Sequence, residues 1–217
     1  MMDHFLASVE PFKRLSPAER HRLALVSREK RYAKGEAVFR AGEPADTVCI
    51  VKEGRVHLMK FLEGGQASTT CVMTNGETFC CLPALDQKPY PVDAVAAMDS
   101  VVVRVPTSAF HELLQRNPQF LQESLCLFCD RLRQVEHKSC MVYDSVERRL
   151  AQALVTLSKK FGATIPLTKQ ELAELASTTV ETTIRVLSEF KKRGIVKSSR
   201  GSTTIAKLDQ LRQLTSS

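Results

Sequence analysis

The stretch from Thr168 to Gly194, TKQELAELASTTVETTIRVLSEFKKRG, constrains the fold more strongly than any other part of the sequence. Apolar residues recur at helical spacing in each half of it. Between the halves, the hydroxyls of Thr178-Thr179 suit the start of a second helix. The apolar positions are Leu172, Leu175 and Ala176 in the first half and Val180, Ile184 and Leu187 in the second. The stretch therefore predicts two short helices joined by a tight turn, the second ending at a glycine.

The second of these helices carries polar side chains between its apolar positions. Glu181, Thr182 and Arg185 lie there, and the basic run Lys191-Lys192-Arg193 follows. Two short helices, a tight turn and an exposed polar face are typical of helix-turn-helix units that bind DNA. A plain helical hairpin with a solvated charged face produces the same pattern, so the motif alone leaves both interpretations open.

The distribution of charge separates the two ends of the chain. The net charge is +7; residues 144–217 hold 13 lysines and arginines against 7 aspartates and glutamates, whereas residues 1–143 hold 18 against 17. All seven cysteines and all five histidines lie at or before position 140. A basic excess that coincides with the helix-turn-helix pattern favours a polyanion, and specifically double-stranded DNA, as the partner of this end.

The apolar runs are too short for a membrane span. None approaches the ~20 residues that a spanning helix needs, and the first residues, MMDHFLASVEPFKR, lack the apolar core of a signal peptide. We therefore expect a cytoplasmic protein without a membrane partner, whose cysteines are reduced.

Short β-rich runs separated by glycines dominate residues 32–106. Residues 4–31 before them predict a helical lead-in, in which Ser16-Pro17 marks the start of a helix. Strands this short and evenly spaced predict a compact barrel or sandwich, with a hairpin turn at Glu63-Gly64-Gly65-Gln66. The predicted strands cover residues 37–39, 48–51, 56–61, 67–73, 92–97 and 101–105.

A long helix is expected next, after a shorter helix at residues 107–115. Its mostly apolar seam alternates steps of four and three over three heptads, or about 30 Å of helix. The seam consists of Leu121, Leu125, Phe128, Leu132, Val135, Ser139 and Val142. A lone helix with such a seam needs a partner, so a two-fold homodimer is predicted. The alternative is that the seam packs on the chain's own barrel.

The C-terminal third continues with elements that suit a winged helix-turn-helix. Tyr143-Asp144-Ser145 predicts a hinge, residues 146–161 an amphipathic helix, and residues 195–205 a β-hairpin wing with Arg200-Gly201 at its tip. The complete order predicts an α+β chain in three parts. These are a β-roll, or jelly-roll-like barrel, with an N-terminal helix over residues 1–116, a dimerisation helix over 117–143, and a winged helix-turn-helix domain for DNA binding over 144–217.

This order of parts resembles the Crp/Fnr superfamily of bacterial transcription regulators over most of the chain, from Tyr32 to the wing. The most specific stretches are KGEAVFRAGEPADTVCIVKEGRVHL in the barrel and LTKQELAELASTTVETTIRVLSEFKKRGIV in the helix-turn-helix. The resemblance implies a homodimer that binds a palindromic site with its second helix in the major groove. It also implies RNA polymerase as a partner and no enzymatic activity.

By position within this resemblance, Glu181 and Arg185 match the acidic and basic base readers of the family. Glutamate accepts a hydrogen bond from cytosine N4, and arginine donates two to guanine. Val180 stands where the cyclic-AMP branch has arginine, and an apolar residue there implies the Fnr-like branch; Ile184 replaces the small polar reader of many Fnr-like members. Val180, Glu181 and Arg185 are thus the predicted base readers. The predicted DNA-backbone contacts are Thr168, Lys169, Thr178, Thr179, Thr182, Lys191, Lys192, Arg193, Lys197, Ser199 and Arg200.

The resemblance also places an effector pocket in the barrel. Its expected residues are Gly76, Glu77, Phe79, Cys80, Cys81, Leu82, Tyr90, Pro91 and Val92. Cyclic-AMP-binding members hold the phosphate with an Arg-Ser pair, and Pro91-Val92 occupies that position here. A buried cyclic phosphate would lose its main counter-charge, unless Lys88 supplied one. We therefore expect an effector other than cyclic AMP.

Three kinds of switch remain open. The first is haem, because Cys80 falls near the thiolate ligand of the carbon-monoxide-sensing branch; Leu82 replaces the histidine of that branch, and the unplaced candidates are His4, His21, His57 and His111. The second is thiol oxidation at Cys80-Cys81 or at Cys126 and Cys129. The third is a small organic effector. Any one cysteine is most often a small buried apolar side chain.

The cysteine spacings do not favour a metal centre. Cys126, Cys129, His137 and Cys140 have zinc-like spacings, but the first and last are about 21 Å apart along a continuous helix, too far for one ion. No cysteine precedes Cys49. We therefore do not expect the N-terminal iron–sulfur cluster of the Fnr branch.

Two other classes of function compete with a DNA-binding regulator. A thiol-based redox enzyme would use Cys80-Cys81, but no histidine or arginine lies next to them in the sequence to activate a thiolate. A ligand-binding module that regulates a partner protein is the other class, and the concentrated basic charge disfavours it.

Overall fold

The computed structural model describes residues 2–61, 67–140 and 144–216, and the backbone alone at Ala84, Arg131, residues 134–140 and Ser216. Contacts divide the chain into two compact units, one of Met1–Lys60 and Thr70–Glu136, the other of Phe61–Thr69 and His137–Ser217. The predicted hairpin turn at Glu63–Gln66 and the seam position Val142 lie outside the described residues. So do the side chains of the seam positions Val135 and Ser139.

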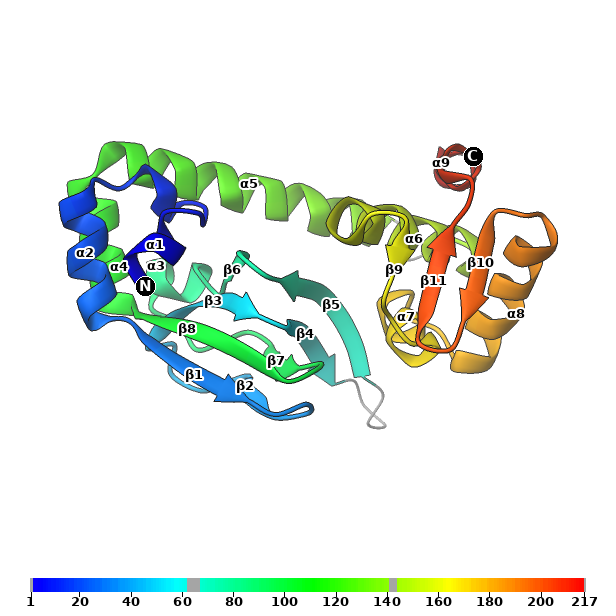
Figure 1. The fold of residues 1–217 in the computed structure, drawn as a ribbon, viewed down its shortest axis with the longest axis horizontal. Helices are drawn as coiled ribbons and strands as arrows, with labels where there is room; N and C mark the ends of the chain where they lie inside the picture. Colours follow the sequence, from blue (N-terminus) through cyan, green and yellow to red (C-terminus); the bar gives the residue numbers. More distant parts are fainter. Residues whose placement is uncertain (1, 62–66, 141–143, 217) are drawn as a thin grey trace. The chain divides into compact units, whose positions relative to one another are not determined.

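Two four-stranded sheets form the β-roll (Figure 1). One has the strand order β1-β8-β3-β6 and the other β2-β7-β4-β5. The first contains β1 (Arg28–Tyr32), β8 (Ser100–Pro106), β3 (Thr47–Glu53) and β6 (Thr78–Phe79). The second contains β2 (Ala37–Phe39), β7 (Asp93–Ala96), β4 (Arg55–Phe61) and β5 (Ala67–Thr74). The predicted β-roll is confirmed.

Both faces of the two central strands of the first sheet, β3 and β8, are buried, which explains their nearly continuous apolar runs. In β3, Cys49 and Val51 join the cluster between the two sheets, whereas Val48 and Ile50 join a second cluster with the helices. We call these the interior cluster and the helix-side cluster. The interior cluster holds Tyr32, Val38, Phe39, Cys49, Val51, Val56, Leu58, Met73, Phe79, Cys80, Tyr90, Val92, Ala94, Ala96 and Val102.

Helices cover the outer side of the first sheet (Figure 1). They are α1 (Met2–Leu6), α2 (Pro17–Val26), α4 (Thr107–Arg116) and α5 (Pro118–Cys140), with a short 3-10 turn at Phe12–Arg14. A capping box between Ser16 and Glu19 starts α2, as the Ser-Pro pair predicts. A further short helix, α3 (Leu82–Asp86), was not predicted.

Residues 28–32 correct the predicted helical lead-in, because they form the edge strand β1. Arg28 pairs with Arg104 and Tyr32 with Ser100. The first four residues of the strand, REKR, are exposed. Charged residues are common on edge strands, where they discourage pairing with other chains. They also conceal the alternation of apolar and polar residues by which a strand is recognised in sequence.

The long helix α5 carries two apolar stripes rather than one. Phe120 and Ser124 are buried, and Phe120 packs in the helix-side cluster with Phe128 partly buried beside it. Leu125 and Leu132 instead remain 50% and 59% exposed. Leu121, at the other end of the stripe, is also exposed. The inner stripe is therefore buried against other parts of the chain, whereas the outer stripe is exposed to solvent.

The second unit surrounds the amphipathic helix α6 (Val146–Phe161), whose buried residues are Leu150, Ala151, Leu154 and Leu157. The helices α7 (Lys169–Leu175), α8 (Val180–Lys192) and α9 (Leu208–Ser216) pack against it. A three-stranded sheet has the order β10-β11-β9, from Val196–Ser199, Ser202–Ile205 and Thr164–Ile165. The winged helix-turn-helix is thus present, and α9 is an addition to the prediction. No described helix is long and apolar enough to cross a membrane.

Candidate nucleic-acid interface and effector site

Both helices of the helix-turn-helix begin at a threonine that caps them with its side chain. Thr168 starts α7 with a capping box: its hydroxyl accepts from the Glu171 N–H at 3.2 Å, and the Glu171 carboxylate accepts from the Thr168 N–H at 2.7 Å. Thr179 starts α8 by accepting from the Thr182 N–H at 3.2 Å. Thr178 does not cap; its N–H donates to the Ala173 carbonyl at 3.0 Å. Ser177 forms the corner with a φ of +49°.

Arg149 on α6 holds this turn, a role that the sequence pattern did not reveal. Its guanidinium donates to the Ala176 carbonyl at 2.8 Å and to the Ser177 carbonyl at 3.3 Å. A third bond, at 2.6 Å, goes to the Asp144 carbonyl in the predicted hinge. One side chain therefore ties the corner of the helix-turn-helix to the residues that precede α6.

The buried face of α8 differs from the predicted apolar stripe. Thr183, Leu187 and Phe190 are buried, whereas Ile184 is 52% exposed. These buried positions are separated by steps of four and three, so they form one stripe along the helix. Ile184 lies about 100° around the helix from Thr183, at the edge of the face that the helix presents to solvent. The predicted stripe of Val180, Ile184 and Leu187 was therefore wrong at Ile184.

The predicted base readers lie at the N-terminal end of α8. Val180 is its first residue and is partly exposed. Glu181 and Arg185 are exposed and one turn apart. Among the described residues neither of them takes part in an ion pair, so both charged groups are available to a ligand.

The predicted DNA-backbone contacts differ in whether their side chains already have a partner within the chain. Lys191, Lys197 and Arg200 are exposed and form no ion pair within the described part of the chain. Lys192 instead pairs with Glu189 at 2.7 Å, and Arg193 with Glu147 at 2.8 Å. The hydroxyl-bearing candidates serve local structure: Thr168, Thr179 and Thr182 at the helix starts, and Ser199, whose hydroxyl lies 2.7 Å from that of Ser202.

Lys169 is turned towards the wing. Its ammonium group donates to the Ser199 carbonyl at 3.0 Å and to the Ser202 carbonyl at 3.4 Å. Burial beneath the hairpin lowers the pKa of Lys169. These two carbonyls flank the tip Arg200-Gly201, where Gly201 adopts a φ of +78° that favours glycine. The lysine thus holds the turn that presents Arg200.

The predicted effector residues do not share one surface. Phe79, Cys80, Tyr90 and Val92 lie in the interior cluster, where the rings of Tyr90 and Phe39 stack at 3.8 Å. Cys81 lies in the helix-side cluster. Leu82 and Pro91 are exposed, and Gly76 and Glu77 form a turn in which the Glu77 carboxylate accepts from the Thr74 N–H at 2.7 Å. Four of the predicted pocket residues therefore lie in the interior cluster, together with the ring of Phe39.

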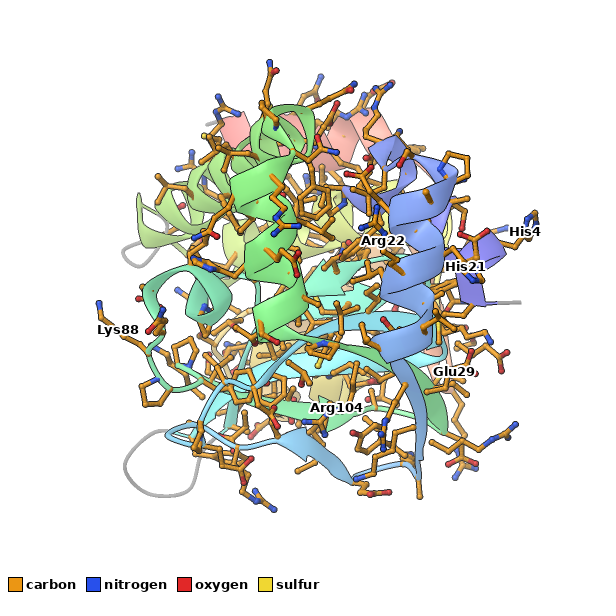
Figure 2. All side chains as sticks on the ribbon, turned by 90° about the vertical axis from the view of Figure 1, so that its left-hand side faces the viewer. His4, His21, Arg22, Glu29, Lys88 and Arg104 are labelled. Carbon is orange, nitrogen blue, oxygen red and sulfur yellow. The ribbon has the colours of Figure 1, made fainter. Side chains whose placement is uncertain are left out.

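A polar group at the edge of the interior cluster centres on Arg104 of β8, which Figure 2 labels on the sheet with β1. The guanidinium of Arg104 donates to the Thr47 hydroxyl at 3.2 Å, the Asp46 carboxylate at 3.2 Å and the Tyr32 hydroxyl at 3.4 Å. The Tyr90 hydroxyl donates to the Thr47 carbonyl at 2.8 Å. In the sequence, this polar group is indicated by Arg104, the single charged residue in the apolar run VVVRV.

Two side chains next to this polar group have raised pKa values. Burial raises the pKa of Tyr90 to about 12. Burial likewise raises the pKa of the Cys49 thiol to about 12, although Arg104 nearby favours the thiolate. Both groups are therefore protonated at neutral pH.

The candidate haem ligands lie in different parts of the fold. Cys80 is buried in the interior cluster, and the neighbouring Leu82 is exposed. His4 and His21 lie on the outside of the molecule (Figure 2). His57 is buried in β4 and His111 is partly exposed on α4. No cluster of three metal-binding side chains occurs in the described part of the chain.

Lys88, the alternative source of positive charge in place of the missing arginine, is turned to solvent. Lys88 is exposed and projects from its loop on the side of the view opposite His4 and His21 (Figure 2). Its ammonium group lies 3.3 Å from the Asp86 carboxylate. It therefore contributes no positive charge to the interior cluster.

Two family models match the chain in the order of its units. Residues 29–117 match the cyclic nucleotide-binding domain, and residues 148–214 match the Crp-like helix-turn-helix domain. The chain is 26% identical over 205 residues to the cyclic AMP receptor protein of Thermus thermophilus, covering 94% of this chain and 95% of that protein. It is 25% identical over 181 residues to the transcriptional activator protein Anr of Pseudomonas aeruginosa, covering 79% and 74%.

Solved structures show the same fold. FixK2 from Bradyrhizobium japonicum superposes with a TM-score of 0.80 at 22% identity, over 88% of this chain and 98% of that one. A CooA mutant from Carboxydothermus hydrogenoformans gives a TM-score of 0.75 at 21% identity, over 94% and 92%. With both domain models matched in order, the chain belongs to the Crp/Fnr family of DNA-binding transcription regulators.

Proposed function

We propose that the chain is a homodimeric regulator that reads a palindromic DNA site with two copies of α8. The observation that carries this proposal is the exposed face of α8, where Glu181 and Arg185 form no ion pair with the other described residues, on a helix capped by Thr179. Carboxylate and guanidinium groups at this spacing suit a cytosine and a guanine edge in the major groove. Lys191, Lys197 and Arg200 supply exposed positive charge for phosphates.

The outer stripe of α5 supports the homodimer. The exposed Leu121, Leu125 and Leu132 are spaced for a helix-to-helix seam, and the family is typically dimeric. A second copy of α5 would bury this stripe, because a two-fold axis brings identical surfaces together. Two copies of α8 would then read two inverted half-sites.

We further propose that the regulator belongs to the Fnr-like branch and that its effector is neither cyclic AMP nor haem. Val180 at the start of α8 supports the branch. The effector proposal rests on Pro91-Val92 in place of the phosphate-binding pair and on the burial of Cys80 in the cluster that also holds the stacked rings of Phe39 and Tyr90. An effector that changes the β-roll would act by shifting the α5 seam and thereby re-spacing the two α8 helices. RNA polymerase is the proposed partner that senses the bound dimer.

A redox enzyme is not supported by the positions of the vicinal cysteines. Cys80 and Cys81 are both buried and belong to different clusters on opposite sides of the same sheet. Neither thiol is therefore exposed to a substrate. The family regulates transcription and is not enzymatic.

The proposal is tested by selecting bound sequences from a randomised duplex library with the purified full-length chain. We expect an inverted repeat whose half-site centres lie about one helical turn, ~34 Å, apart. Enrichment of a single unrepeated motif would overturn the dimeric mode of reading. No enrichment at all would overturn sequence-specific DNA binding.

A further inference from the structure

The exposed face of α8 has an apolar edge beside its polar edge. Ile184 is 52% exposed, and Val180 lies one turn before it. Residues three and four apart are neighbours on a helix. Ile184 is therefore a neighbour of Glu181 as well as of Val180, and Arg185 follows it directly. The β-branched pair runs alongside the two predicted charged readers.

A single exposed isoleucine on a protein surface needs no special explanation. The position of Ile184 is different, because DNA must cover this face if Glu181 and Arg185 reach base edges. An isoleucine placed against polar base edges would remove water from them without replacing a hydrogen bond. The apolar group that the major groove offers is the C5-methyl group of thymine.

We propose that Ile184 is a specificity-determining residue that reads a thymine methyl group in each half-site. This inference rests on the proposed function, since it assigns one further base contact to the same helix. Isoleucine is stiff at χ1, so its methyl groups are already ordered on the free helix. Cytosine at the same position offers an amino group and no methyl, and isoleucine has no acceptor for that amino group. The contact thus separates thymine from cytosine.

The test removes one methyl group from the DNA. Each thymine of the selected site is replaced in turn by deoxyuridine, which keeps every hydrogen-bonding group, and affinity is measured for the wild-type chain. At one position per half-site we expect binding to weaken about fourfold, the effect of one buried methyl group. Equal affinity for thymine and deoxyuridine at every position would overturn the inference.

A protein variant checks that Ile184 makes this contact. Ile184→Ala is expected to weaken binding to the thymine duplex and to lose the sensitivity to deoxyuridine at that position. Ser188→Ala, one turn further along the same exposed face, is the matched control and should retain that sensitivity. Continued sensitivity in Ile184→Ala would assign the methyl effect to another residue or to the DNA itself, and the inference would be wrong.

The same experiment distinguishes failure of this inference from failure of the proposed function. If the chain enriches a palindrome but ignores every thymine methyl, the regulator stands and only the role of Ile184 falls. If the chain enriches no sequence, the proposed function itself falls, and the thymine contact falls with it.

Discussion

At the scale of single residues, α8 separates the side chains that hold the fold from those that face solvent. Thr183, Leu187 and Phe190 are buried, while Glu181 and Arg185 project from the other side. A solvent-facing residue such as Glu181 or Arg185 contributes little to the stability of the fold and acts only when a ligand is bound. Substitutions there should therefore change DNA binding without changing the folding transition.

The first prediction concerns Arg185→Ala. It should weaken binding to the selected site by about 1–3 kcal/mol and change binding to random duplex much less, because a bidentate contact to guanine is lost only where that guanine is present. Fluorescence anisotropy on both duplexes measures the difference. Ser188→Ala should bind both duplexes nearly as the wild type does. An equal loss on the two duplexes for Arg185→Ala would contradict base reading.

The second prediction concerns the thiols. Burial raises the pKa of Cys49 to about 12, so at pH 8 an alkylating reagent should modify the exposed Cys126 and Cys129 and leave Cys49 unmodified until the chain unfolds. The raised pKa also stabilises the fold while the thiol is protonated. That contribution is complete below the unfolded value of about 8.5 and is lost as pH rises towards 12. Mass spectrometry of labelled peptides measures the order in which the cysteines react. Labelling of Cys49 at the same rate as Cys126 and Cys129 would contradict its burial.

At the scale of elements, α5 illustrates how one helix serves two surfaces. Its inner stripe packs on the β-roll through Phe120, and its outer stripe carries Leu125 and Leu132. The sequence predicted one seam and left open whether it packs on the barrel or on a second copy. The structure shows that the helix has a stripe for the barrel and a separate exposed one.

The third prediction follows from the outer stripe. Leu125→Glu should convert the dimer to a monomer at micromolar concentration, because it places a charge opposite its own copy in an apolar seam. Sedimentation velocity measures the mass, and circular dichroism checks the fold. Leu25→Glu on α2, where the leucine is 73% exposed, is the matched control and should remain dimeric. A dimeric Leu125→Glu variant would place the dimer interface elsewhere.

In the wing, the Lys169 side chain supports the hairpin that presents Arg200. If Lys169 acts through the wing, its removal should matter only while Arg200 is present. The fourth prediction is therefore non-additive DNA binding in the set Lys169→Met, Arg200→Ala and the double variant, with a coupling of about 0.5–1.5 kcal/mol. Lys169→Arg should largely restore binding. Additive losses would instead indicate that Lys169 contacts a phosphate on its own.

At the scale of the whole molecule, the sequence predicted the β-roll, the long helix and the winged helix-turn-helix, because each has a strong hydrophobic period or a clear cap. It missed β1 because four charged residues conceal that strand. The apolar pattern predicted a buried Ile184, because steps of four and three fit two faces of α8 equally well. The contacts of Arg149 and Lys169 could not be predicted, since they join residues 27 to 33 positions apart through side chains.

Binding of duplex DNA by the basic C-terminal unit can be tested through the salt dependence of its affinity for random duplex. Three of the exposed basic residues of this unit, Lys191, Lys197 and Arg200, would give about six phosphate contacts in a dimer. The logarithm of the association constant should then fall against the logarithm of salt concentration with a slope of about −5. A slope near zero, or no binding at low salt, would contradict the account.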